Sequence, residues 1–203
     1  METTSWRLTA LILVCVLGVA GCGTVQVSSK TYGTGVEQPP AKGNGGSQDT
    51  GNATASASVL IPGAEAPDVT LTLEPSGKQV QLASYIGKKP LIINAWASWC
   101  PPCQEETPHF VKLYADYKAE VQFLGVNLTS LDSIVDAEAF IRRYHIPYPV
   151  LFDTKGDFYR AYSVIAEPMT YVVSPSGKVV SIHVGALSSS ALNQVVQQAI
   201  ASR

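Results

Sequence analysis

The sequence predicts an α/β fold in which a mixed central sheet is covered by helices on both faces. Three observations indicate this class. The globular part opens with a hairpin pattern, short and nearly continuous apolar runs follow as buried strands, and segments with apolar residues at helical spacing separate these runs. The strand–helix–strand order at the front and the hairpin and helix at the back predict strands of both directions in one sheet.

Length and composition fit one such domain with appendages. The chain has 203 residues, 46% hydrophobic and 15% charged, so it has enough apolar side chains for a core and is not disordered throughout. The formal net charge of −2 provides no basic surface for nucleic acid. The three histidines are far apart in the sequence, and neither a metal site nor a cofactor is predicted.

Residues 1–21 are predicted to be a secretory signal peptide. Residues 8–20 are almost entirely apolar, and they match a signal-peptide core but fall short of the roughly 20 residues of a membrane-spanning helix. The segment ends in Val-Ala-Gly-Cys22, which resembles the signal of bacterial lipoproteins. The resemblance implies that Cys15 is removed and that a lipid on Cys22 anchors the protein at the extracytoplasmic face of the cell membrane. An ordinary cleaved signal and an uncleaved anchor are the alternatives.

Residues 22–58 are predicted to form a flexible tether. These 37 residues include seven Gly, five Ser, five Thr and two Pro, with Tyr32 as the one aromatic residue. Such a segment buries too little apolar surface to offset the entropy lost on ordering. A random coil of this length spans roughly 35 Å, enough to hold a small domain close to a membrane surface. The folded domain is therefore expected over residues 59–203.

The domain is expected to begin with a β-hairpin and a buried strand. Residues 69–73 and 79–82 alternate between polar and apolar side chains around a turn with Pro75 and Gly77. Residues 91–96 form a short apolar run that is typical of a strand buried on both faces.

Helices and further strands follow along the chain. Two helical segments each place apolar residues on one face: Phe110, Leu113, Tyr114 and Tyr117 in the first, and Ile134, Ala137, Ile141 and Tyr144 in a helical insertion. The last helix has an apolar stripe from Leu187 to Ile200. Further strands are expected over residues 121–126, 148–152, 169–173 and 179–184.

Two cysteines three positions apart, Cys100 and Cys103, stand where a buried strand passes into a helix. The unpaired N–H groups and the dipole of a helix N-terminus stabilise a thiolate, so they lower the pKa of a thiol below the value of about 8.5 of free cysteine. Cys100 is therefore predicted to be the nucleophile. Pro101 suits the first turn because it lacks an N–H group that would stay unpaired there. Cys103, one turn further on, is expected to be more shielded and to act as the resolving thiol.

The stretch Ile-Asn-Ala-Trp-Ala-Ser-Trp-Cys-Pro-Pro-Cys, residues 93–103, resembles the active-site segment of the thioredoxin superfamily. Among the proteins of this superfamily, the chain resembles membrane-tethered, extracytoplasmic thiol–disulfide oxidoreductases of the cytochrome c maturation branch. The resemblance covers residues 60–203 and implies a redoxin domain of the AhpC/TSA type. Pro108 stands where this group kinks its active-site helix, Pro168 where it places a cis-proline opposite the redox pair, and Glu106 where this branch has an acidic residue. The resemblance implies a thioredoxin-like fold with an N-terminal hairpin and a helical insertion.

The resemblance also implies roles for residues around the cysteines. The implied substrate-binding residues beside the redox pair are Trp99, Pro101, Pro102, Glu167 and Pro168. Thioredoxins usually carry a buried Asp at the position of Asn94, and Asn cannot accept a proton. Glu106 is therefore expected to deprotonate Cys103, because positions i and i+3 of a helix are neighbours. Glu167 departs from the usual residue before the cis-proline and places a negative charge beside the substrate groove.

The predicted function is the reduction of protein disulfides outside the cytoplasm, by attack of Cys100 and release through Cys103. The implied partners are protein disulfides, with apocytochrome c as one candidate, and a membrane electron donor that reduces the protein again. The chain is expected to act as a monomer.

Other functions are open from the sequence. The protein could act in the opposite direction as a disulfide oxidant, or reduce secreted proteins in general. A thiol peroxidase needs Pro-x-x-x-Thr-x-x-Cys, where this chain has Ile93 and Ala97. The cysteine pair could be half of a zinc site or a structural disulfide, although no second pair completes a zinc site. A non-enzymatic lipoprotein that only binds partners is the remaining alternative.

Overall fold

The computed structural model describes residues 59–203. The predictions for the signal peptide 1–21, for Cys22 and for the tether 22–58 therefore lie outside the described residues. None of the helices found within residues 59–203 has both the length and the apolar character needed to cross a membrane.

A seven-stranded sheet forms the centre of the domain, in the order β2-β1-β5-β4-β3-β6-β7. Its strands are β1 (Thr70–Glu74), β2 (Lys78–Gln81), β3 (Leu91–Trp96), β4 (Gln122–Asn127), β5 (Val150–Phe152), β6 (Met169–Val173) and β7 (Val179–Val184). The strands β3, β4 and β5 run parallel, whereas the pairs β1–β2, β1–β5, β3–β6 and β6–β7 are antiparallel. The predicted mixed sheet and its opening hairpin are therefore confirmed.

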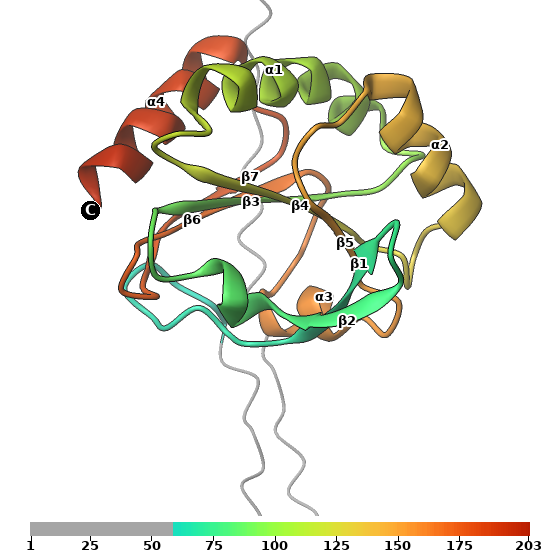
Figure 1. Ribbon diagram of the computed structural model, residues 1–203, viewed down its shortest axis with the longest axis horizontal. Helices are drawn as coiled ribbons and strands as arrows, with labels where there is room; N and C mark the ends of the chain where they lie inside the picture. Colours follow the sequence, from blue (N-terminus) through green and yellow to red (C-terminus); the bar gives the residue numbers. More distant parts are fainter. Residues whose placement is uncertain (1–58) are drawn as a thin grey trace, which may run out of the picture. The chain divides into compact units, whose positions relative to one another are not determined.

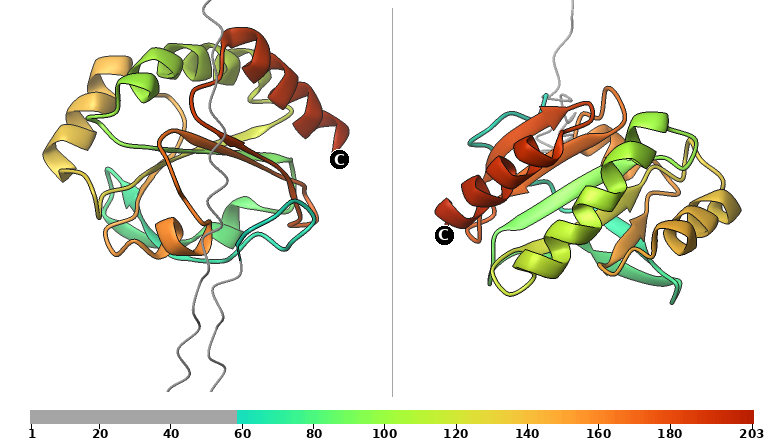
Figure 2. Two further views of the ribbon diagram at one scale, coloured as in Figure 1. Left: turned by 180° about the vertical axis from the view of Figure 1, so that it is seen from behind. Right: turned by 90° about the horizontal axis from the view of Figure 1, so that it is seen from above.

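Helices cover both faces of this sheet (Figures 1 and 2). The helices α1 (Pro101–Tyr117), α2 (Ile134–Tyr144) and α4 (Ser189–Ala201) lie over one face. The five-residue α3 (Asp157–Ala161) and a short 3-10 helix (Leu82–Tyr85) lie over the other. This arrangement confirms the predicted α/β class with helices on both faces.

The sheet separates two parts of the core, and β3 contributes to both. All six residues of β3 are buried, as predicted for a strand covered on both faces. Successive side chains of a strand point to opposite faces. Ile92 accordingly packs in the cluster with Phe110 and Val195 under α1 and α4, while Ile93 packs in the cluster that contains Phe158 of α3.

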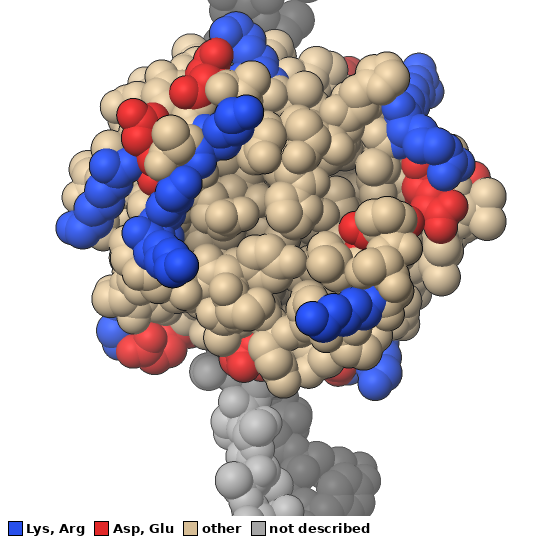
Figure 3. All heavy atoms as spheres, viewed as in Figure 1, with Lys and Arg blue, Asp and Glu red and all other residues tan. Residues whose placement is uncertain are grey.

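The surface of the domain carries charges of both signs. Figure 3 shows Lys and Arg next to Asp and Glu around an uncharged centre on the face that it displays. The i,i+4 pairs Lys112–Asp116 and Arg142–Glu138 are examples, at 2.8 and 3.4 Å between the charged atoms. These pairs are exposed, so each contributes little to stability.

Two details differ from the sequence prediction. Ile134 was expected on the buried face of α2, but it is 49% exposed. It is the first residue of the helix, directly after the N-cap Ser133, and the buried stripe begins one turn later with Ala137 and Phe140. The helix α3 was not predicted, because five residues are too few for a helical period to be recognised.

Candidate active site

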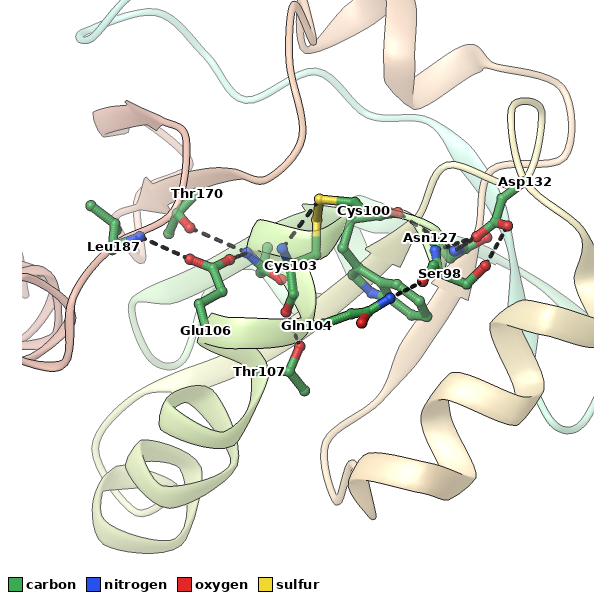
Figure 4. Close-up of a disulfide and its surroundings, with 12 residues drawn as sticks. Ser98, Cys100, Cys103, Gln104, Glu106, Thr107, Asn127, Asp132, Thr170 and Leu187 are labelled. Atoms are coloured by element: carbon green, nitrogen blue, oxygen red, sulfur yellow. Dashed lines mark hydrogen bonds between the residues drawn. A yellow bond between two sulfur atoms is a disulfide. The ribbon is translucent and has the colours of Figure 1, made fainter.

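The two cysteines of the motif lie where β3 passes into α1. Cys100 is the N-cap residue of α1, with an extended backbone, and the helix begins at Pro101. Cys100 and Cys103 form a disulfide, with their Cα atoms 5.3 Å apart (Figure 4). The backbone N–H of Cys103 donates a hydrogen bond to Sγ of Cys100 at 3.2 Å. The site is thus in its oxidised form, and a backbone donor of the first helical turn is directed at the Cys100 sulfur.

This geometry can stabilise a thiolate on Cys100 once the disulfide is reduced. The first N–H groups of a helix have no partner within the helix, and the helix dipole adds positive potential at the same end. Cys100 is 2% and Cys103 1% exposed, so the disulfide form does not show the expected difference in shielding.

Glu106 lies one turn after Cys103 and is 2% exposed. Its Oε1 accepts a hydrogen bond from the side-chain amide of Asn94 at 2.8 Å, and its Oε2 accepts one from the backbone N–H of Leu187 at 3.0 Å. Burial raises the pKa of Glu106 to about 7, although the hydrogen bonds from Leu187 and Asn94 act in the opposite direction. Figure 4 shows Glu106 between Leu187 and Cys103. The group can therefore exchange a proton near neutral pH, as a general acid or base must.

The cis-proline segment lies at the end of β3 from which the chain runs into the cysteine pair. The Glu167–Pro168 peptide bond is cis, and Pro168 comes directly before β6, whose first residue Met169 pairs with Ala95 of β3. Pro168 is buried and its carbonyl accepts a hydrogen bond from Gly185 at 2.8 Å. Glu167 is half-buried, so its side chain remains partly accessible.

The other residues expected to contact a substrate surround the cysteine pair. Trp99 is 55% exposed, and Pro101 and Pro102 are exposed at the start of α1. A hollow of about 320 Å³ lies between Trp99 and α2, with the buried Phe140 in its wall. The rings of Trp99, Pro101 and Pro102 thus offer apolar contact surface beside the disulfide, whereas the lining of the hollow also includes the charged Asp136 and Arg143.

Sequence reasoning missed a group of polar residues next to Trp99. The carboxylate of Asp132 accepts hydrogen bonds from the backbone N–H and the hydroxyl of Ser98, both at 2.7 Å, and from the side chain of Asn127 at 2.8 Å. Figure 4 shows these three residues together beside Cys100. Asp132 is 34 positions away from Ser98 in the sequence, so no local pattern indicates this contact.

The comparisons with known proteins support the assignment that this geometry suggests. The sequence model of the AhpC/TSA family matches residues 62–182, which is more than half of the chain. The chain belongs to the AhpC/TSA family. It is 37% identical over 134 residues to the thioredoxin-like protein YneN of Bacillus subtilis (strain 168), covering 65% of this chain and 76% of YneN. It is 31% identical over 135 residues to the thiol-disulfide oxidoreductase ResA of the same bacterium, covering 66% of this chain and 73% of ResA.

Solved structures of related proteins have the same fold as this member of the AhpC/TSA family. A protein described as the thiol:disulfide interchange protein DsbE of Chlorobium tepidum superposes with a TM-score of 0.63 at 33% identity, covering 70% of this chain and 99% of that one. A secreted disulfide oxidoreductase of Mycobacterium tuberculosis, homologous to DsbE of E. coli, superposes with a TM-score of 0.57 at 25% identity, covering 64% and 94% of the two chains. The fold is thioredoxin-like, and this member of the AhpC/TSA family is a thiol–disulfide oxidoreductase.

No metal centre accompanies the disulfide in the described domain. Among residues 59–203, no group of three or more His, Cys, Asp and Glu side chains is arranged to hold a metal ion.

Proposed function

We propose that this oxidoreductase reduces disulfides of proteins outside the cytoplasm, with Cys100 as the nucleophile and Cys103 as the resolving thiol. One observation carries the proposal: the two cysteines form a disulfide at the N-terminus of α1, where the backbone N–H of Cys103 is directed at Sγ of Cys100. Only Cys100 occupies the N-cap position, so its thiolate receives the larger stabilisation.

The reaction transfers two electrons from the cysteine pair to the substrate. The Cys100 thiolate bonds to one substrate sulfur while the substrate disulfide breaks, which leaves a mixed disulfide and one substrate thiolate. Cys103 then loses its proton, bonds to Sγ of Cys100 and releases the second substrate thiolate. The two substrate thiolates take up protons. The Cys100–Cys103 disulfide that remains must be reduced by a dithiol donor in the membrane.

Glu106 is proposed to accept the proton of Cys103. It is placed one turn after Cys103, it is buried, and its raised pKa of about 7 lets it take up a proton near neutral pH. Asn94, at the position of the usual Asp, donates a hydrogen bond to Glu106 and does not itself take a proton.

Substrate is proposed to bind across the apolar surface beside the disulfide. Trp99, Pro101 and Pro102 are exposed next to Cys100. An extended substrate segment would pair with the backbone before β6, where Glu167 and Pro168 stand, by adding main-chain hydrogen bonds along an edge. The negative charge of Glu167 would disfavour acidic segments.

The place of action and the physiological partner belong to the proposal as well. The lipoprotein-like Val-Ala-Gly-Cys22 supports anchoring by a lipid on Cys22, and the secreted relative of M. tuberculosis supports a site outside the cytoplasm. Apocytochrome c is the proposed substrate because Glu106 matches the cytochrome c maturation branch. The protein is proposed to work as a monomer.

Trapping of the mixed disulfide tests the proposal. A Cys103→Ser variant, expressed in the source organism, is expected to accumulate partners bound through Cys100, because the resolving thiol is missing. Partners are released by reductant and identified by mass spectrometry, with Cys100→Ser as the matched control. Capture of c-type apocytochromes would support the maturation role, and capture of many secreted proteins a general reductase. Equal capture by both variants would contradict the assigned roles.

The direction of the reaction has its own test. A reductase is expected to have a lower reduction potential than glutathione. The wild type should therefore stay oxidised in a buffer that contains both reduced and oxidised glutathione. A protein that is mostly reduced in this buffer would be an oxidant instead. Consumption of hydrogen peroxide by the reduced protein, without a disulfide substrate, would favour a peroxidase.

A further inference from the structure

The segment between β4 and α2 is bound to the loop that carries the nucleophile. In this segment, the Asp132 carboxylate accepts four hydrogen bonds. Oδ2 accepts from the backbone N–H of Ser98 at 2.7 Å and from Nδ2 of Asn127 at 2.8 Å. Oδ1 accepts from the Ser98 hydroxyl at 2.7 Å and from the backbone N–H of Ser133 at 2.8 Å. A carboxylate with four donors in place is held rigidly, and it fixes those donors in turn.

Two more contacts hold the same loop. The indole N–H of Trp99 donates to the carbonyl of Leu131 at 3.1 Å, and the side-chain amide of Gln104 donates to the carbonyl of Ser98 at 3.0 Å. Ser98 is therefore held through its N–H, its hydroxyl and its carbonyl. The peptide unit two residues before Cys100 has little freedom to move.

We infer that Asp132 is a positioning residue for thiol–disulfide exchange, which keeps Cys100 at the N-cap of α1 by holding Ser98. The inference rests on the proposed role of Cys100 as the nucleophile. In the oxidised form the disulfide itself also restrains Cys100. In the reduced form that bond is absent, so the loop depends more strongly on the Asp132–Ser98 contacts and on those of Trp99 and Gln104.

A positioning role and a purely electrostatic role of Asp132 predict opposite changes in the pKa of Cys100 when Asp132 is replaced. Asp132 carries a negative charge close to the active-site loop, and removal of a negative charge favours a nearby thiolate. Loss of positioning acts the other way, because the stabilisation by the helix N-terminus falls off within the first turn. The sign of the change in Cys100 reactivity therefore distinguishes the two roles.

Asp132→Asn is the test variant, because Asn has nearly the same shape but brings an N–H donor against donors already present. Glu105→Gln on α1 is the matched control: Glu105 is exposed, and within residues 59–203 its carboxylate makes no hydrogen bond. Both changes remove one negative charge. In the reduced full-length protein, alkylation of Cys100 by iodoacetamide is followed by mass spectrometry across pH.

The expected result is a midpoint of Cys100 alkylation that rises by about half to one pH unit in Asp132→Asn and stays level or falls in Glu105→Gln. The equilibrium with glutathione should shift toward the disulfide form by about threefold or more, because the reduced form loses stabilisation. Ser98→Ala, which removes only the hydroxyl contact, should shift both measurements in the same direction by less.

Other outcomes overturn the inference. A midpoint that falls in Asp132→Asn would show that the residue acts by charge, and a lower melting temperature with an unchanged midpoint would show a merely structural role. If Asp132→Asn does not fold, Ser98→Ala takes its place as the test, and an alkylation midpoint that does not rise in Ser98→Ala would reject the positioning role. A wild-type midpoint equal to that of free cysteine would instead reject the proposed role of Cys100, a separate failure.

Discussion

At the scale of single residues, the fold changes the acid–base chemistry of Glu106. A carboxylate on a helix surface would be ionised at neutral pH, but Glu106 is buried, and burial raises its pKa to about 7. Its two hydrogen-bond donors, from Asn94 and Leu187, limit this rise. The carboxyl group is thus balanced between its two protonation states in the pH range where thiols exchange.

The kinetic consequence can be measured with Glu106→Gln. Formation of the mixed disulfide should proceed as in the wild type, whereas its resolution by Cys103 should slow about 100-fold, the smaller end of the range for loss of a general base. Rapid mixing with an oxidised model peptide between about pH 6 and 9 separates the two steps. Glu105→Gln is the control on the same helix. Kinetics unchanged from the wild type over this range would remove Glu106 from the mechanism.

The same residue makes stability depend on pH. In the unfolded chain a Glu ionises near its usual pKa of 4.5, but in the folded protein Glu106 stays protonated up to about 7. Between these values the folded state binds more protons, so the free energy of unfolding falls as pH rises, by up to about 3 kcal/mol in all. Urea titrations at several pH values should show this fall in the wild type and its loss in Glu106→Gln. A pH dependence identical in both proteins would refute the assignment.

At the scale of elements, α2 is attached to the sheet by aromatic side chains. Phe140 stacks on Trp96, the last residue of β3, with ring centroids 4.4 Å apart, and it contacts Tyr144 at 4.5 Å. Ala137 is buried on the same face of the helix. The predicted stripe of Ile134, Ala137, Ile141 and Tyr144 was therefore wrong at Ile134, and it did not include Phe140, the buried residue that packs on Trp96.

Loss of the Phe140 side chain should lower the stability of the domain. Phe140→Ala is expected to lower the free energy of unfolding by about 3–5 kcal/mol, because it removes a buried ring and leaves a cavity. Val135→Ala, on the exposed side of the same helix, should change it by about 0.5 kcal/mol or less. Chemical denaturation of both variants measures the difference. Equal small losses would mean that α2 does not depend on Phe140 for its attachment.

At the scale of the whole molecule, the site is assembled from segments distant in sequence. Asn94 of β3 contacts Thr170 of β6, 76 positions away, and Glu106 of α1 contacts Leu187, 81 positions away. Both contacts exist because β6 lies beside β3 in the sheet and α4 packs on α1. The redox centre therefore depends on the complete domain, although its two cysteines are three residues apart.

The proposed membrane attachment is a property of the whole chain and has a simple test. Cys22→Ser should move the protein from the membrane fraction to the soluble fraction of its source organism, because the lipidated cysteine would be absent. Cys15→Ser, within the segment that is removed, should leave the protein in the membrane fraction. Fractionation followed by immunoblotting measures both. A Cys22→Ser protein that stays in the membrane would point to an uncleaved anchor.

Local sequence patterns were enough to predict the class of the fold and the position of the cysteine pair at the start of a helix. The strands β3 and β6 have the predicted bounds, and the redox cysteines stand at the predicted start of a helix, because strand burial, helical spacing and capping are set by residues close together in the chain. Cys103 and Glu106 are neighbours because positions i and i+3 lie on the same face of a helix.

The distant groups that complete the site became apparent only from the folded domain. The contact of Asp132 with Ser98, the donors to Glu106 and the packing of Phe140 on Trp96 each join elements whose contact depends on strand order and helix packing. No local period or spacing encodes such contacts, since they depend on how the whole chain buries its apolar surface. Burial of Glu106, which sets its pKa, is a result of the same packing.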